Sequence, residues 1–360
     1  MDTTNFVPTS IDFLQEGMVV PHDIYNANGS LLLLRGGSEL SVTNITAIRR
    51  YNDGENTIRV SPETYKLLMQ QRPADKNAGW ESLEESAGYA AAKQKFSVMY
   101  AQIERTETVS GQLAQEALAE IREILETKRP DLIIDLINAG ALAPISDYFM
   151  RHSVNVGLLN GLIGKWMGLP VEEIDLLMQV GLLHDCGKAL LPGRILYAPR
   201  PLSAVEFEVI KTHPLNGFNL LGDFPEAVRK GVRDHHERLN GGGYPGAGAG
   251  MAIGWQARIT AVSDIYAAMT SNRAYNAPQS PFHAMAALSR MRQTELEPSV
   301  VDVFINNMCK DLTGKTFMLS IAATGTIHSI DPDDLEYPNI KISDRVVKTN
   351  AKLFCKHMHF

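Results

Sequence analysis

The sequence has few cysteines, no long apolar segment and no excess of positive charge. Cys186, Cys309 and Cys355 are the only cysteines among 360 residues, and their wide spacing suits neither a disulfide framework nor a thiolate zinc site. This indicates a reducing compartment. The N-terminus lacks the basic start and apolar stretch of a secretory signal, and the apolar run at residues 31–34 is too short to span a bilayer. We therefore expect a soluble, cytoplasmic protein.

Acidic residues outnumber basic ones, and the formal net charge is -7. Binding to a DNA or RNA polymer needs clustered Lys and Arg that displace counterions from phosphates, so the composition argues against it. One small phosphate ligand in a local basic pocket stays compatible with this charge. The length of 360 residues predicts a main domain with one or two smaller appendages.

Both ends of the chain have strand-like patterns. Apolar stretches at 18–20, 31–34 and 58–60 are separated by turn residues such as Asn28-Gly29, which predicts a small mixed β domain over residues 1–72 with one short helix at 41–51. From residue 313 to 360, short β-like stretches alternate with turn signals. We expect a β-rich tail there.

The middle of the chain is helical in pattern. Residues 73–130 are rich in Ala, Glu, Gln and Lys, which favours a helical linker. That segment can act as a spacer or dimerising helix, or it can pack along its own domain, and the sequence leaves both open. Residues 131–312 continue the helical pattern and contain the chemistry. The predicted fold is therefore mainly α, with a small β domain before the helices and a β tail after them.

Five of the ten histidines fall between residues 152 and 236. Apolar residues at positions 174, 177 and 180 precede His184 at helical spacing, and positions 156, 159 and 163 continue the same pattern after His152. Both imidazoles should therefore point toward the core. Asp185 lies beside the first of them, and Lys188 follows one turn later.

The other polar candidates also occupy helix ends or apolar faces. His213 ends a helix that starts with a capping-box pattern, and Pro214 prevents its simple continuation. Valines at 228 and 232 lead into His235 and His236, so at least one of the two should face inward. Asp264 is embedded in a strongly apolar stretch.

A metal ion would satisfy these buried groups together. A lone inward histidine such as His152 is more often a hydrogen-bonded core residue than a ligand, and His184-Asp185 alone could be a cap or an ion pair. Taken together with Asp264, however, the buried groups would each need a separate hydrogen-bond or ion-pair partner, because an unpaired buried carboxylate costs several kcal/mol. Imidazole and carboxylate ligands suit iron, manganese, zinc or nickel, and Asp185 could bridge two such ions.

A glycine-rich loop follows the last two histidines of this set. The segment Asn240 to Pro245 contains Gly241, Gly242, Gly243 and Tyr244, so it allows close backbone approach to a ligand and offers an aromatic face. Most glycine-rich loops are only turns, but this position predicts a pocket rim. Arg273 is a candidate phosphate-binding side chain, although a surface arginine is more often simply solvated.

The segments His184-Asp185-Cys186-Gly187-Lys188 and His235 to Pro245, which ends in Gly243-Tyr244-Pro245, resemble the two signature motifs of the HD-GYP family. The resemblance covers about residues 148–308 and includes His152, His213-Pro214, Asp264 and Arg273. It implies an HD-type helical bundle and a bacterial signalling phosphodiesterase that hydrolyses cyclic di-GMP to pGpG or GMP.

The resemblance also implies a binuclear metal site with two divalent ions, iron or manganese being favoured over other metals. The ions would polarise the phosphate and lower the pKa of a bridging water. Lys188 would stabilise charge on the phosphoryl oxygens or assist proton transfer, while Gly243, Tyr244, Pro245 and Arg273 would contact the substrate. The implied ligands are His152, His184, Asp185 and Asp264 for one ion, and Asp185, His213 and His235 for the other. His236 is a further implied ligand, and the resemblance leaves open which of the two ions it serves.

Two positions depart from the family pattern. Tyr148 stands where members proposed to carry a third metal have a Glu, so we expect two metals. Asn276 replaces the Lys that usually follows Arg273 by three residues, which predicts weaker substrate binding or a different cyclic dinucleotide such as cyclic GMP-AMP.

Other functions stay open at this stage. The chain could be a catalytically weak or inactive HD-GYP protein that senses a cyclic dinucleotide or acts as a scaffold, although all the principal ligands are present. An HD phosphohydrolase of linear nucleotides is a third hypothesis, which the Gly243-Tyr244-Pro245 loop disfavours. A homodimer, or a signalling partner with a GGDEF domain that contacts the helical or GYP region, is compatible with the resemblance.

Overall fold

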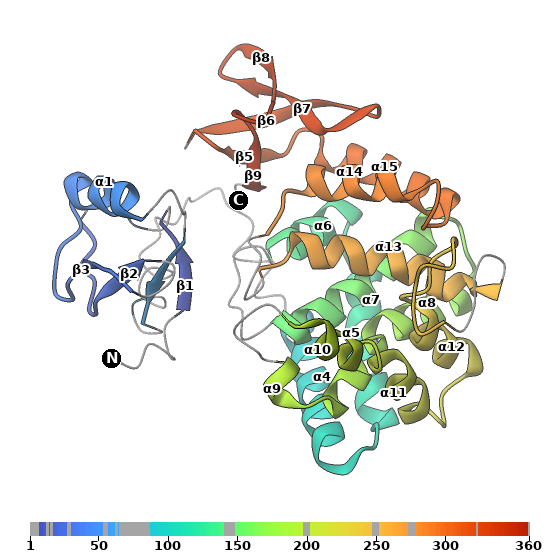
Figure 1. Cartoon of the computed structure of the whole chain (residues 1–360). Helices are drawn as coiled ribbons and strands as arrows, with labels where there is room; N and C mark the ends of the chain where they lie inside the picture. Colours follow the sequence, from blue (N-terminus) through green and yellow to red (C-terminus); the bar gives the residue numbers. More distant parts are fainter. Residues whose placement is uncertain are drawn as a thin grey trace. The chain divides into compact units, whose positions relative to one another are not determined.

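The computed structural model describes residues 7–11, 14, 17–26, 30–52, 57–61, 64, 87–139, 148–196, 202–246, 252–272, 278–321 and 323–358. The chain divides into two compact units, Met1–Ala78 and Gly79–Phe360. Among the described residues, no helix is both long enough and apolar enough to cross a membrane. Figure 1 shows the elements of each unit.

The smaller unit is an antiparallel sheet with one helix. Its strands are β1 (Val7–Ser10), β2 (Ile24–Asn26), β3 (Leu32–Leu34) and β4 (Thr57–Val60), in the order β1-β4-β2-β3. The helix α1 (Val42–Tyr51) starts at Ser41, whose hydroxyl accepts a hydrogen bond from the Asn44 N–H. Ile24, Ile48 and Ile58 form part of the apolar core of this smaller unit. The predicted mixed β unit with one short helix is confirmed.

The larger unit is a helical bundle followed by a sheet. Helices α7 (Tyr148–Trp166) and α8 (Val171–Leu183) are its centre and pack tightly against each other. A Cβ at Gly181 would lie 2.7 Å from both the Gly157 Cα and the Val156 carbonyl oxygen, so only glycine allows this approach. The two helices carry His152 and lead into His184, and their contact brings these side chains together.

The remaining helical elements surround this pair. They are α4 (Ala87–Thr106), α5 (Gly111–Thr127), α6 (Pro130–Ala139), the 3-10 helix η4 (Cys186–Leu190), α9 (Gly193–Leu196), α10 (Ala204–Ile210), α11 (His213–Leu220), α12 (Glu226–Asp234), α13 (Trp255–Thr270), α14 (Pro281–Met291) and α15 (Pro298–Leu312). Helices α12 and α13 pack on α8, and α13 also packs on α7.

Helices α4 and α5 are part of this bundle. Phe96 and Met99 of α4 and Ile121 of α5 are buried in the same core as α7 and α8. Arg122 of α5 also makes two hydrogen bonds of 2.9 Å to the Asp175 carboxylate of α8. Of the two interpretations that the sequence leaves open for these helices, the structure shows packing along their own domain.

The C-terminal sheet belongs to the same unit. It contains β5 (Thr316–Leu319), β6 (Thr324–Asp331), β7 (Asp334–Ile342), β8 (Arg345–Lys348) and β9 (Cys355–Met358), with all neighbours antiparallel in the order β8-β7-β6-β5-β9. Strand β7 lies against α14 (Figure 1). The Phe317 and Phe282 ring centroids are 5.1 Å apart. The predicted mainly α fold with β structure at both ends is confirmed.

Candidate metal centre

Three histidines stand at helix ends in the same way. His184 follows the last residue of α8, His235 follows that of α12, and His213 comes shortly after α10 and opens α11. In each, Nδ1 lies 2.7 Å from the carbonyl oxygen three residues earlier. Because a carbonyl only accepts, Nδ1 carries the proton, and the Nε2 lone pair is left to bind something else.

The first group of ligand atoms joins α7, α8 and α13. His152 Nε2 lies 3.0 Å from an Asp264 carboxylate oxygen and 3.2 Å from His184 Nε2. His184 Nε2 is 3.3 Å from Asp185 Oδ2. The helices that carry these residues are distant in sequence, so the close approach of α7 to α8 creates this group.

The second group lies on the other side of Asp185. The Oδ1 atom of Asp185 is 3.2 Å from His213 Nε2, which is 3.4 Å from His235 Nε2. His236 Nδ1 is 3.8 Å from the other Asp264 oxygen. Asp185 therefore faces histidines with both of its oxygens.

This geometry fits a cation better than ordinary hydrogen bonding. With both Nδ1 atoms protonated, His213 Nε2 and His235 Nε2 are two acceptors 3.4 Å apart, and two acceptors cannot bond each other. His152, 1% exposed, has no hydrogen-bond partner for Nδ1 among the described residues. A positive ion between the lone pairs would satisfy several of these groups at once.

Two sets of side chains have ligand atoms that lie within 4.8 Å of one another, and Asp185 is common to both. The donors are imidazole nitrogens and carboxylate oxygens with no thiolate, which suits iron, manganese or zinc. The centre is therefore a His/Asp cluster that could bind metal. The two sets are His152, His184 and Asp185, and Asp185, His213, His235 and His236.

Burial and neighbouring charges favour the metal-binding forms of His235 and Asp185. Burial lowers the pKa of His235 well below its ordinary value, with repulsion from neighbouring histidines adding to the effect. Burial alone would raise the pKa of Asp185, but His184 and Lys188 hold that pKa well below its usual range. His184 differs: burial lowers the pKa of its imidazole, but Asp185 and Asp264 together outweigh burial, and the pKa is raised. The carboxylates thus make a pocket that attracts positive charge.

Lys188 lies at the edge of the cluster. Its Nζ donates to Asp185 Oδ2 at 2.6 Å and lies 5.8 Å from the centre of the Phe149 ring. The 3-10 helix η4 that carries it packs closely on α11, since a Cβ at Gly187 would be 2.1 Å from the His213 carbonyl oxygen. The glycine in this motif is therefore needed for packing between two ligand-bearing segments.

The predicted glycine-rich rim adjoins the second group. A Cβ at Gly243 would lie 2.3 Å from the His236 carbonyl oxygen, so the loop folds back directly onto its own start. The Tyr244 ring stacks on the His236 imidazole, with 4.5 Å between centroids. The backbone N–H of Tyr244 donates to the His236 carbonyl oxygen at 3.2 Å. Burial raises the pKa of Tyr244, which keeps its hydroxyl protonated. Pro245 is half-buried in the same loop.

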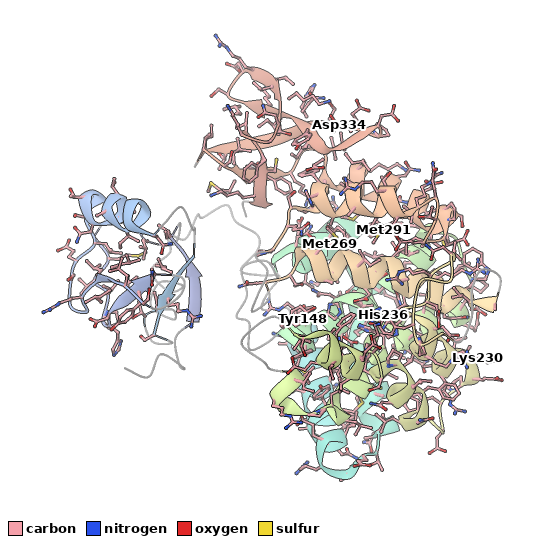
Figure 2. All side chains as sticks on the ribbon, viewed as in Figure 1. Tyr148, Lys230, His236, Met269, Met291 and Asp334 are labelled. Atoms are coloured by element: carbon pink, nitrogen blue, oxygen red, sulfur yellow. The ribbon has the colours of Figure 1, made fainter. Side chains whose placement is uncertain are left out.

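Three other positions that the sequence singled out are not among the candidate metal ligands. Arg273 and Asn276 lie outside the described residues. Tyr148, where a third-metal Glu would stand, stacks its ring on His152 with 5.3 Å between centroids. Figure 2 labels Tyr148 and His236 within the helical unit.

Two contacts were not predicted from the sequence. Phe149 lies beneath Lys188, and Lys211 places its Nζ 5.9 Å from the centre of the Tyr244 ring. Phe149 precedes His152 by three residues on the same helix, so helical spacing could have indicated it. Lys211 carried no such signal, because its contact depends on a loop that lies more than thirty residues further along the chain.

Known proteins resemble this chain in sequence and in fold. Residues 153–300 match the family model of the HD domain. The solved structure of Bd1817, a HDG"Y"P protein from Bdellovibrio bacteriovorus, aligns with a TM-score of 0.51 at 14% identity, over 84% of this chain and 99% of that one. This likeness shows the fold.

The cyclic di-GMP phosphodiesterase response regulator RpfG from Xanthomonas campestris pv. campestris is 33% identical over 202 residues, which are 54% of this chain and 51% of RpfG. The chain resembles HD-GYP proteins. The residues that carry the resemblance are His184-Asp185 and the stretch from Gly243 to Pro245.

Two further relatives differ in what their names say they act on. Cyclic di-GMP phosphodiesterase PA4108 from Pseudomonas aeruginosa is 28% identical over 77% of this chain and 67% of its own length. The 3'3'-cGAMP-specific phosphodiesterase 1 from Vibrio cholerae is 32% identical over 54% of this chain and 44% of its own length. The chain thus spans about half the length of RpfG and two thirds of PA4108.

Proposed function

We propose that this protein is a phosphodiesterase that hydrolyses cyclic di-GMP, to pGpG or GMP, with two divalent metal ions. The observation that carries the proposal is the shared Asp185 carboxylate. One of its oxygens faces His184 at 3.3 Å and the other faces His213 at 3.2 Å, which is the arrangement that a bridging ligand needs.

The ligands would come from five separate segments. Asp185 would belong to both ions, which we expect to be iron or manganese. The 3.0 Å contact between His152 and Asp264 supports placing that aspartate with the first ion. Tyr148 offers no carboxylate, so two ions are proposed. The first ion would have His152, His184, Asp185 and Asp264, and the second Asp185, His213, His235 and His236.

When bound, the ions supply an activated water and polarise the phosphate that it attacks. Lys188 would sit beside the reacting phosphate, because its Nζ already lies 2.6 Å from Asp185, and would stabilise charge that develops on the phosphoryl oxygens or assist proton transfer. The helix-end carbonyls would fix the imidazole tautomers throughout the reaction.

The rim would bind the rest of the substrate. Tyr244 offers an aromatic face beside His236, and Gly243 brings backbone close to the site. Pro245 and Arg273 would contact the substrate as well. The names of RpfG and PA4108 support cyclic di-GMP, while that of the Vibrio cholerae relative makes 3'3'-cGAMP the alternative to include in any assay. A homodimer or a GGDEF-type partner stays a prediction.

The test is hydrolysis of both cyclic dinucleotides by wild type, Asp185→Ala and the exposed control Asp223→Ala, with metal content measured for each. We expect wild type and the control to retain metal and turnover, and Asp185→Ala to lose both. An unchanged rate in Asp185→Ala would rule out the bridging role. Tight binding of cyclic di-GMP without turnover at saturating manganese or iron would instead indicate a sensor.

A further inference from the structure

The proposed substrate has two negatively charged phosphodiesters, and the metal cluster can bind only one of them. A cyclic dinucleotide has two phosphodiesters, and only one can sit between the metal ligands at a time. The other keeps a full negative charge, which needs a cation outside the cluster. This inference rests on the proposed function and concerns which side chain supplies that cation.

Lys211 lies next to the rim of the centre. Its Nζ is 5.9 Å from the centre of the Tyr244 ring, and that ring stacks at 4.5 Å on the imidazole of the proposed ligand His236. One aromatic ring thus separates the ammonium group from the cluster. The backbone of Lys211 is held in place, because its N–H donates to the Phe207 carbonyl at 3.0 Å at the end of α10.

The contacts of Lys211 within the chain are weak. Its Nζ lies 2.7 Å from Glu208, but the side chain of Glu208 is 69% exposed. Its other close neighbour is the ring of Phe207 at 5.2 Å, on a residue that is 45% exposed. Exposed ion pairs of this kind contribute little to stability, so the ammonium can exchange Glu208 for a phosphate at small cost.

Among the described residues, two other cations near the cluster already have partners, while Arg273 lies outside the described residues. Lys188 donates to Asp185 at 2.6 Å and would serve the reacting phosphate. Arg238 donates to the backbone carbonyl oxygens of His235 and Glu237 at 3.3 and 2.9 Å. Lys211 follows helix α10, which buries none of its residues, and comes two residues before the completely buried His213. Its backbone is therefore anchored beside the cluster, while its side chain stays partly exposed.

We propose that Lys211 binds the phosphodiester that is not being cleaved, at the rim beside Tyr244. It is a substrate-binding residue that selects cyclic dinucleotides over smaller phosphodiesters. Its ammonium would form a charge-assisted hydrogen bond with the non-bridging phosphate oxygens.

The experiment compares Lys211→Met with wild type on cyclic di-GMP and on bis(p-nitrophenyl) phosphate, which has a single phosphodiester. Methionine keeps the length and apolar stem but removes the charge. We expect the KM for cyclic di-GMP to rise about tenfold, the loss of one hydrogen bond to a charged group, with kcat and metal content unchanged. Both constants for bis(p-nitrophenyl) phosphate should stay as in wild type, and Lys211→Arg should restore most of the KM.

Lys230→Met is the matched control. Lys230 also pairs with a glutamate on its own helix, Glu226 at 2.8 Å, and Figure 2 labels it at the edge of the unit, away from His236. Its KM should equal that of wild type. An unchanged KM in Lys211→Met, or an equal loss on both substrates, would overturn the role of Lys211 while leaving the phosphodiesterase intact. A wild-type protein that neither binds nor hydrolyses a cyclic dinucleotide would overturn the proposed function, and this inference with it.

Discussion

The inner cluster and the rim of the centre are built in different ways. His184, His213 and His235 of the cluster are completely buried, and each is held by a hydrogen bond to its own helix end. The rim consists of the loop around Tyr244 and the end of α10 with Lys211, and both side chains keep partial exposure. The cluster is thus part of the buried core, whereas the rim lies at the surface and contacts the cluster from outside.

Substitutions in the cluster and substitutions at the rim should therefore affect different properties of the protein. A side chain in the cluster is held by helix packing, so its loss should alter metal content and stability together with activity. A side chain at the rim touches the substrate but supports little of the fold, so its loss should mainly alter KM.

The largest effect is expected from Asp264→Ala in the cluster. The substitution removes the carboxylate that lies 3.0 Å from His152, so metal content and hydrolysis of cyclic di-GMP should fall together, the rate by on the order of 10³-fold. Metal analysis and a turnover assay on the same sample check this. Retained metal with retained rate would remove Asp264 from the ligand set.

Gly187→Ala should come next, as a loss of stability. Its Cβ would meet the His213 carbonyl at 2.1 Å, and such overpacking costs about 1–3 kcal/mol of unfolding free energy. Denaturant unfolding measures it. Gly111→Ala is the control, because a Cβ there meets nothing within 4 Å. Equal stability of the two variants would contradict the tight contact between η4 and α11.

Tyr244→Leu should change binding at the rim. We expect KM for cyclic di-GMP to rise about two- to fivefold, since the ring lies beneath Lys211 and such a cation–π contact contributes roughly 0.5–1 kcal/mol, while the unfolding free energy stays nearly constant. Tyr244→Phe retains the ring and should retain the KM. If both variants lose metal, Tyr244 supports His236 rather than the substrate, and the separation between rim and cluster is weaker than described.

The smallest effect is expected at Arg122, far from either region. Its two 2.9 Å bonds to Asp175 join α5 to α8, and a partly exposed pair of this kind contributes about 0.2–1 kcal/mol. Arg122→Met should lower the unfolding free energy by that amount without changing kcat or KM. A double-mutant cycle with Asp175→Asn measures the coupling, and zero coupling would mean that the pair does not hold α5 on the bundle.

The sequence predicted the buried residues better than their contacts. Helical spacing indicated that His184 and His152 face inward, and both are buried. It could not say that their Nε2 atoms meet at 3.2 Å, because periodicity reports the face of one helix and not its neighbour. The same limit left α4 and α5 undecided between a spacer and a packed pair.

The sequence by itself determined the helical class and the β structure at both ends, since apolar periodicity and turn residues act over a few neighbouring positions. It also predicted the types of candidate ligand. Only the tertiary structure decided that both oxygens of Asp185 face histidines and that Lys211 lies over Tyr244. Those contacts join segments that are distant in the chain, and the packing of whole helices and loops sets their distances.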